Sequence, residues 1–210
     1  MDRQKKIWFL IPFFGTIIFL VLYLVATYYY PGGSQTDQYA VGFSWANNYW
    51  CNLLNDTAIN GSPNPAKPIA ITGMIVLSLA LGYFWILFPR LINIGNLAGL
   101  TTQVSGILSM FIACFLFTKI DHDIVTNLAS VFGIIATVGV FIGLYKIKWD
   151  GLFVFGLINI LLVVLNNYLY YQEGLIIYLP IIQKISFVSF LIWICCIDIN
   201  LYRSRLFTGV

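Results

Sequence analysis

Six long apolar runs divide this sequence, and they constrain its fold more than any other feature. Each run holds roughly 20 residues, the length at which an apolar helix crosses the hydrocarbon core of a bilayer. The runs are continuous rather than alternating, which argues against a transmembrane barrel. Hydrophobic residues make up 60% of the 210 positions and charged residues 9%, whereas soluble domains carry about 25% charged residues. The sequence therefore predicts an all-α integral membrane protein, with residues 1–210 forming a single six-helix bundle.

The helix ends follow from turn residues at the ends of the apolar runs. We expect the membrane helices near residues 7–29, 69–88, 97–117, 124–145, 152–171 and 175–197. The first run lacks a small-residue cleavage site, so it is interpreted as a retained helix rather than a signal peptide. Pro89 with Arg90 is expected to close the second helix. Pro180 predicts a kink in the last helix that would free a backbone carbonyl.

The distribution of Lys and Arg predicts an orientation. Eight of the eleven basic residues fall on one side of the predicted helices: Arg3, Lys5, Lys6, Arg90, Lys146, Lys148, Arg203 and Arg205. Two fall on the other side, Lys67 and Lys119, and Lys184 lies inside a helix. Because cytoplasmic loops carry the excess of basic residues, both termini are expected in the cytoplasm. The expected location is a plasma (cell inner) membrane, crossed several times.

One long loop, residues 31–67, separates the first two helices and is expected outside the cell. It mixes aromatic and amide side chains, and a loop of this length usually has structure or a function of its own. We expect a short interfacial helix near residues 44–56, the alternative being an ordinary aromatic-rich interfacial segment. Asn55 and Asn60 each begin a glycosylation sequon, which matters only in a secretory pathway.

Lys184 is the clearest candidate for a functional residue. An ionisable residue inside a membrane helix is a functional hypothesis by default. It lies about nine residues, or ~14 Å, from the predicted outer end of the last helix, so it is expected to face the interior. The alternative is a structural lysine paired with backbone carbonyls or a carboxylate. Both interpretations require a partner, because an unpaired buried charge is costly.

Polar side chains on two other helices lie at a similar predicted depth. Asn159 and Asn166 are seven residues apart and share one helix face. Asp123 and Asn127 begin a polar stripe on the fourth helix. Hydrogen bonding between helices is the alternative explanation for these side chains. The residues expected to form an outward-facing ligand pocket are Asp121, His122, Asp123, Asn127, Asn166 and Lys184, with Asn159 deeper.

The Asp121-His122-Asp123 stretch holds the only histidine in the chain. A carboxylate beside an imidazole suits a metal site or an oriented general base. Adjacent residues point in different directions on a helix, so a metal site there would need help from Asp56 or Glu173. The alternative is a solvated turn in which an aspartate caps the fourth helix. No cofactor is predicted, and the four cysteines show neither a disulfide framework nor metal-binding spacing.

Residues 42–54, 63–68 and 122–123 carry a resemblance to a known family. The chain is similar to the six-helix bacterial membrane proteins grouped as domain of unknown function 998. Those proteins are distantly similar to six-helix proteins of autophagy modulation and of GPI-anchor remodelling. The resemblance implies six helices and an outward-facing first loop, and it carries no established activity. The family pattern has an acidic residue where this chain has Asn52, which puts charge-dependent chemistry there in doubt unless Asp56 takes that role.

Four functions remain open at this point. The favoured hypothesis is binding or sensing of a lipid headgroup or small amphiphile, with Lys184 as the buried cation. A structural or partner-binding role, a metal-assisted lipid hydrolase and a small-solute transporter are the alternatives. No hydrolase, nucleotide-binding or metalloprotease motif occurs, and no basic tract indicates a nucleic-acid partner. The expected partners are therefore membrane lipids, while the ligand, any enzymatic activity and the oligomeric state are left open.

Overall fold

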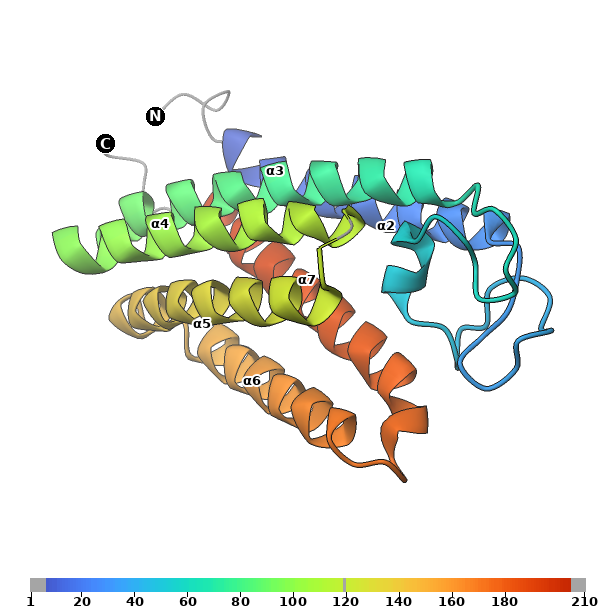
Figure 1. The fold of residues 1–210 in the computed structure, drawn as a ribbon. Coiled ribbons are helices and arrows are strands. Elements are labelled where there is room, and N and C mark those ends of the chain that lie inside the picture. The colour runs from blue at the N-terminus through green and yellow to red at the C-terminus, as the bar shows by residue number, and fades with distance from the viewer. Residues whose placement is uncertain (1–6, 119, 205–210) are drawn as a thin grey trace. The chain divides into compact units, whose positions relative to one another are not determined.

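The computed structural model describes residues 7–118 and 120–204 and is helical apart from its loops (Figure 1). Six helical segments in these residues are long and apolar enough to cross a membrane. The α-helices are α2 (Ile11–Tyr29), α3 (Lys67–Ile92), α4 (Asn96–Ala113), α5 (His122–Lys146), α6 (Asp150–Tyr170) and α7 (Leu179–Arg203). Short 3-10 helices precede α2 (η1, Trp8–Leu10), follow α4 (η3, Cys114–Phe117) and precede α7 (η4, Ile176–Tyr178). The prediction of an all-helical chain with six helices long and apolar enough to span a membrane is thus confirmed.

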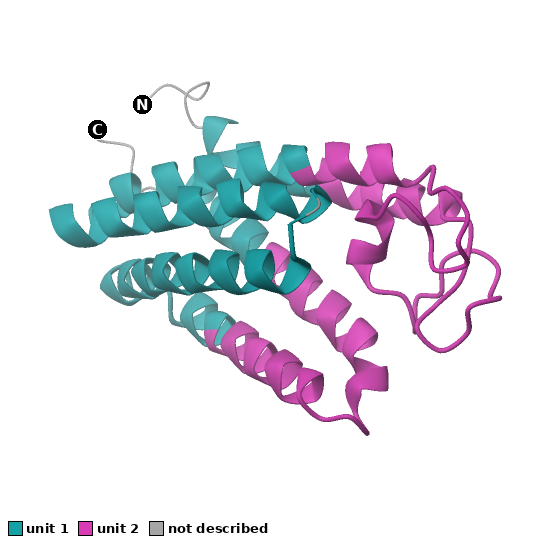
Figure 2. Ribbon diagram, in the orientation of Figure 1, with its two compact units in different colours: residues 1–17, 75–156, 193–210 teal, residues 18–74, 157–192 magenta. Residues whose placement is uncertain are grey.

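The chain divides into two compact units (Figure 2). Unit 1 comprises residues 1–17, 75–156 and 193–210, and unit 2 comprises residues 18–74 and 157–192. Four helices, α2, α3, α6 and α7, contribute one segment to each unit, while α4 and α5 belong entirely to unit 1. Arg3, Lys5, Lys6, Lys119 and Arg205, which the predicted orientation uses, lie outside the described residues.

Small residues set the packing inside unit 1. A side chain at Gly139 of α5 would overlap Thr102 of α4, and one at Gly106 of α4 would overlap the Trp85 ring. Trp85 is almost fully buried. Close approach of helices through small residues is the usual packing mode in membranes, where burial of apolar surface drives little association.

Two prolines behave differently from the prediction. The second helix does not close at Pro89, since α3 continues to Ile92. Both Phe88 and Ile92 are buried, so packing of this last turn outweighs the hydrogen bond that the proline removes. Pro180 is the second residue of α7. Backbone N–H groups in the first turn of a helix have no intrahelical partner, so the N–H that proline lacks is not missed there. Pro180 therefore starts α7 and does not kink it.

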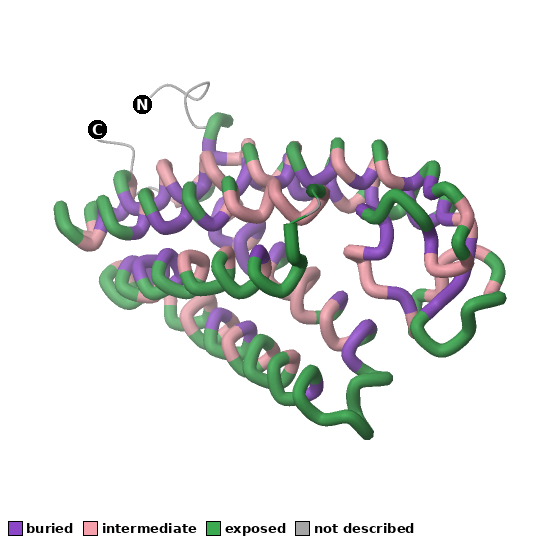
Figure 3. Tube along the Cα trace, in the orientation of Figure 1, coloured by how far each residue is buried: buried purple, intermediate pink, exposed green. Residues whose placement is uncertain are grey.

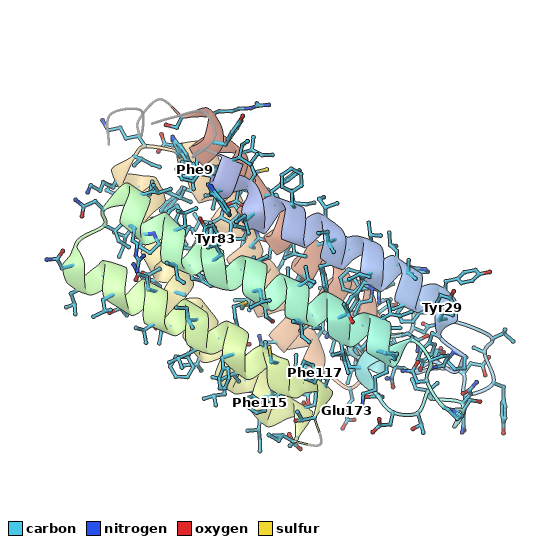
Figure 4. The ribbon with its side chains drawn as sticks, turned by 90° about the horizontal axis from the view of Figure 1, so that it is seen from above. Phe9, Tyr29, Tyr83, Phe115, Phe117 and Glu173 are labelled. Atoms are coloured by element: carbon cyan, nitrogen blue, oxygen red, sulfur yellow. The ribbon has the colours of Figure 1, made fainter. Side chains whose placement is uncertain are left out.

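The long loop of unit 2 has structure of its own, as its length predicts. Instead of a helix over residues 44–56 it forms one 3-10 turn, η2 (Trp50–Leu54). Isolated antiparallel bridges join Gly32 to Val41 and Thr57 to Pro63. The loop contains buried stretches between exposed ones (Figure 3). At its start, the exposed side chain of Tyr29 extends from the end of α2 (Figure 4).

Candidate functional site

The interior of the loop is built around buried asparagine side chains. Asn64 shares its side-chain N–H groups among the carbonyls of Asn52 (3.3 Å), Leu53 (3.2 Å) and Asn55 (2.9 Å). Its carbonyl oxygen accepts from the backbone N–H of Ala66 at 3.1 Å. An asparagine amide carries two N–H donors and an acceptor oxygen, so this single side chain joins the C-terminal part of η2 to the residue before α3.

Asn48 has a similar role in the first part of the loop and is fully buried. Its Nδ2 donates to the carbonyl of Gly33 (2.8 Å), and its Oδ1 accepts from the backbone N–H of Ser44 (2.8 Å). Gly33 has a φ of +80°, where a side chain would be strained and would meet Asn60. These bonds fix the peptide at Asn48, and with it the direction of the Asn48 backbone carbonyl.

That carbonyl accepts a hydrogen bond from Lys184. The lysine lies on α7, and only 8% of it is exposed. Its Nζ donates to the Asn48 oxygen at 2.6 Å and lies 5.9 Å from the centre of the Phe43 ring. A cation at this distance over an aromatic face is attracted by the ring quadrupole. The burial of Lys184 agrees with its predicted position, and its partner is a backbone carbonyl in the loop.

No carboxylate neutralises Lys184 among the described residues. The ion pairs there join Lys67 to Asp56 (2.6 Å) and His122 to Asp123 (3.7 Å). The other acidic residues of unit 2 are exposed: Asp37, which accepts from the Tyr39 N–H (2.9 Å), and Glu173 in the turn after α6 (Figure 4). An ammonium group has three donors, and one of them is used here.

The thiol of Cys51, which interacts electrostatically with Lys184, supplies no negative charge either. Burial of this thiol raises its pKa to about 11, and the positive charge of Lys184 opposes only part of the increase. Burial likewise raises the pKa of the Tyr30 and Tyr49 hydroxyls. These groups are therefore neutral at pH 7, and the positive charge of a protonated Lys184 stays uncompensated in the described part of unit 2.

Aromatic side chains line the same part of the molecule. The Trp50 ring packs edge-on against Tyr23 of α2 (5.5 Å between ring centres) and Phe187 of α7 (5.8 Å). Trp45 links it to Phe43, the ring beside Lys184. The indole N–H of Trp50 is buried and has no hydrogen-bond partner among the described residues. The Lys184 ammonium, with two donors unused, and the Trp50 indole are therefore hydrogen-bond donors of this cluster that lack a partner among the described residues.

The side-chain amide of Asn166, a predicted pocket residue, donates to groups other than Lys184. Asn166 of α6 donates to the carbonyl of Leu162 (2.9 Å) and to the hydroxyl of Ser186 on α7. Its side-chain oxygen has no partner among the described residues, and Asn159 is buried. The Asn166–Ser186 bond between two helices is the contact that the alternative explanation, hydrogen bonding between helices, predicts.

The remaining predicted pocket residues, Asp121, His122, Asp123 and Asn127, belong to unit 1 and are exposed. Asp121 caps α5, because its Oδ1 accepts from the backbone N–H groups of Asp123 (2.9 Å) and Ile124 (3.0 Å). Within residues 7–118 and 120–204, no three His, Cys, Asp or Glu side chains lie together as metal ligands. The capping interpretation of Asp121 is confirmed.

One buried charged residue escaped the sequence analysis. Asp198 on α7 is fully buried in unit 1, and neither carboxylate oxygen has a hydrogen-bond partner among the described residues. In the sequence the last apolar run ends at residue 197, so Asp198 falls outside the predicted helix. The helix in fact continues to Arg203. The sequence feature that could have identified Asp198 was its place as an acidic residue one position beyond an apolar run.

Comparisons with protein-family models, with curated proteins and with solved structures find no match for this chain.

Proposed function

We propose that this protein binds the headgroup of an anionic lipid, or of a small anionic amphiphile, at Lys184 in unit 2. The observation that carries the proposal is a buried ammonium group in a membrane-spanning helix with no carboxylate partner among the described residues. Such a charge is costly to bury alone. A phosphate or carboxylate oxygen would compensate it and use its remaining donors.

The chemistry of the surrounding side chains supports an anionic amphiphile. The buried indole N–H of Trp50 is a second donor without a partner in the described residues. Tyr23, Phe43 and Phe187 supply apolar surface beside the two donors. Ligand sites generally combine an apolar lining with a few fixed polar groups. This cluster has that composition, and its two free donors, the Lys184 ammonium and the Trp50 indole, match an anion.

The proposal includes an orientation. With the excess of basic residues on the cytoplasmic side, both termini would be cytoplasmic and the loop would face outward. Lys184 would then lie in the outer half of a plasma (cell inner) membrane, where a lipid headgroup of the outer leaflet can reach it. The resemblance to the six-helix bacterial family predicts the same arrangement.

Binding of short-chain lipids to the purified protein in detergent tests the proposal. We expect dihexanoyl phosphatidylglycerol to bind the wild type more tightly than dihexanoyl phosphatidylcholine, which has no net charge. Lys184→Met should weaken binding of phosphatidylglycerol roughly 10- to 100-fold, the effect of losing one hydrogen bond between charged groups. Lys184→Arg should retain binding, because the charge is kept.

Lys67→Met is the matched control, since Lys67 lies in the same unit and is already paired with Asp56. It should bind phosphatidylglycerol like the wild type. A folded Lys184→Met protein that binds with unchanged affinity would overturn the proposal. Inorganic phosphate binding as tightly as the lipid would show that the ligand is a free anion instead.

A structural role is the second candidate, and the Lys184–Asn48 hydrogen bond favours it. In that case Lys184 serves only to hold the loop against α7. Lys184→Met would then expose residues 31–66 to proteolysis, and neither protein would distinguish the two lipids.

A further inference from the structure

Asp198 is a buried carboxyl group that the proposed lipid site does not use. It lies in the part of α7 that belongs to unit 1, whereas Lys184 belongs to unit 2. Its exposed fraction is 0%, and both side-chain oxygens lack a hydrogen-bond partner among the described residues. A carboxyl group in this position needs a proton, a metal cation or a basic side chain, because an isolated buried carboxylate is very costly.

The titratable group that interacts with Asp198 is a thiol of the same helix. Cys195, one turn earlier on α7, interacts electrostatically with it and lies beside Cys196. The hydroxyl of Thr16, on α2, lies against the Cys195 thiol and is itself buried. A thiol, rather than a basic side chain, is therefore the titratable neighbour that interacts with the Asp198 carboxyl group on α7.

No charged group of unit 1 within the described residues pairs with Asp198. The ion pairs of the described chain are Lys67–Asp56 and His122–Asp123. The other charged and titratable groups on the described elements of unit 1 are Tyr83 and Arg90 (α3), Cys114 (η3), Asp121, Tyr145 and Lys146 (cap and helix α5), Lys148, Asp150 (α6), and Tyr202 and Arg203 (α7). None of them forms a hydrogen bond with the Asp198 oxygens.

The described residues around Asp198 offer too few ligands for a metal cation. Among the described residues no group of three His, Cys, Asp or Glu side chains is placed to hold a metal ion. Hard cations such as Ca²⁺ take six or more oxygen ligands, and Mg²⁺ takes six. The Asp198 carboxylate itself would supply at most two. A proton needs only the carboxyl group itself.

We propose that Asp198 is a proton-binding site whose carboxyl group is held as the neutral acid when the protein is folded at neutral pH. Loss of this proton would leave a carboxylate in a fully buried position. Proton release would therefore favour states in which water or a cation reaches the segment 193–203 of α7. Buried membrane carboxyl groups of this kind carry protons in relays, and Asp198 is the candidate for that activity here.

The isosteric substitution Asp198→Asn tests the proposal in the detergent-solubilised full chain. Unfolding should release the proton, since an aspartate in the unfolded chain ionises above about pH 4. Raising the pH should therefore lower the wild-type Tm by about 3–5 °C per pH unit as long as the folded acid stays neutral. Asp198→Asn should lack this component, and its Tm should equal or exceed that of the wild type at neutral pH.

Infrared spectroscopy gives an independent measurement that a structural role would not change. The wild type at neutral pH should show the carbonyl stretch of a protonated carboxyl group, and Asp198→Asn should lack it. Asp150→Asn is the matched control, because Asp150 is an exposed aspartate at the start of α6 in the same unit. It should match the wild type in both the infrared band and the pH dependence of Tm.

Three results would overturn the proposal. A lower Tm of Asp198→Asn at neutral pH, with no protonated band in the wild type, would mean an ionised carboxylate paired with a basic group. A wild-type Tm that rises with Na⁺ or K⁺ while that of Asp198→Asn does not would identify a metal cation as the ligand. Persistence of the protonated band in Asp198→Asn would assign it to another residue.

Discussion

The ammonium nitrogen of Lys184 lies 2.6 Å from the backbone oxygen of Asn48, although 136 residues separate them in the chain. The bond joins the last membrane helix to the first loop within unit 2. It also places a positive charge beside the thiol of Cys51. The reactivity of that thiol therefore reports on both the burial of the loop and the charge of the lysine.

Cys51 should react slowly with alkylating reagents in the folded protein. The thiolate is the reactive form, and a pKa of about 11 leaves very little of it at pH 7. In a variant that keeps Cys51 and replaces Cys114, Cys195 and Cys196 by alanine, we expect alkylation about 100-fold slower than in the urea-unfolded chain. Raising the pH towards 11 should increase the folded-state rate, because the thiolate fraction grows with pH.

Lys184→Met, made in the variant that keeps only Cys51, tests the direction in which the charge of Lys184 shifts the pKa of Cys51. Removing the positive charge should raise the pKa of Cys51 further and slow its alkylation. Opening of the loop would have the opposite effect and accelerate it. A folded-state rate equal to that of the unfolded chain would contradict the burial of Cys51.

Asn64→Ala should destabilise the loop. The substitution leaves the carbonyls of Asn52, Leu53 and Asn55 without their shared donor, and unsatisfied buried groups cost about 1–3 kcal/mol. We expect a lower Tm and faster proteolytic cleavage within residues 31–66. Asn55→Ala is the control, because its side chain is exposed and its backbone carbonyl is retained. Equal cleavage of the two variants would argue against Asn64 as the organiser of the loop.

Asp121→Ala should lower the free energy of unfolding by about 1 kcal/mol, the usual contribution of an N-cap. The carboxylate accepts two backbone N–H groups at the start of α5, and alanine cannot replace it. Asp121→Ser should retain most of the stability, because serine also caps helices. Chemical denaturation in micelles measures the difference.

His122→Ala tests whether Asp121, and not the adjacent His122, accounts for the stability of this turn. The side chain is exposed, so the substitution should change stability by no more than about 0.5 kcal/mol. Purified wild-type protein with near-stoichiometric zinc that His122→Ala loses would contradict this interpretation and revive the metal-assisted hydrolase.

The fold was largely predictable, because the length of an apolar run alone indicates a membrane helix. A segment of about 20 apolar residues has few alternatives to a membrane helix. The helix ends were less predictable, since they depend on packing that no local pattern contains. Pro89 indicates an end, yet burial of Phe88 and Ile92 carries α3 past it. The last helix was likewise predicted to end too early, at residue 197, which left Asp198 outside it.

The candidate site was predictable only in part, for a related reason. Intramembrane position identified Lys184 as a buried residue, but its partner is a backbone carbonyl, which every residue carries. Nothing in the sequence distinguishes the carbonyl of Asn48 from its neighbours. The same holds for Asn64, whose role depends on three carbonyls that meet only in the folded loop.

The long sequence separation of Asn48 and Lys184 has a consequence for biosynthesis. At typical synthesis rates of about 5–20 residues per second, the lysine is made roughly 7–27 s after the loop that receives it. During that interval the first loop lacks this contact. The Lys184–Asn48 bond can form only after this part of α7 has been made, so a loop that holds the bond marks a chain whose synthesis has reached its last long helix.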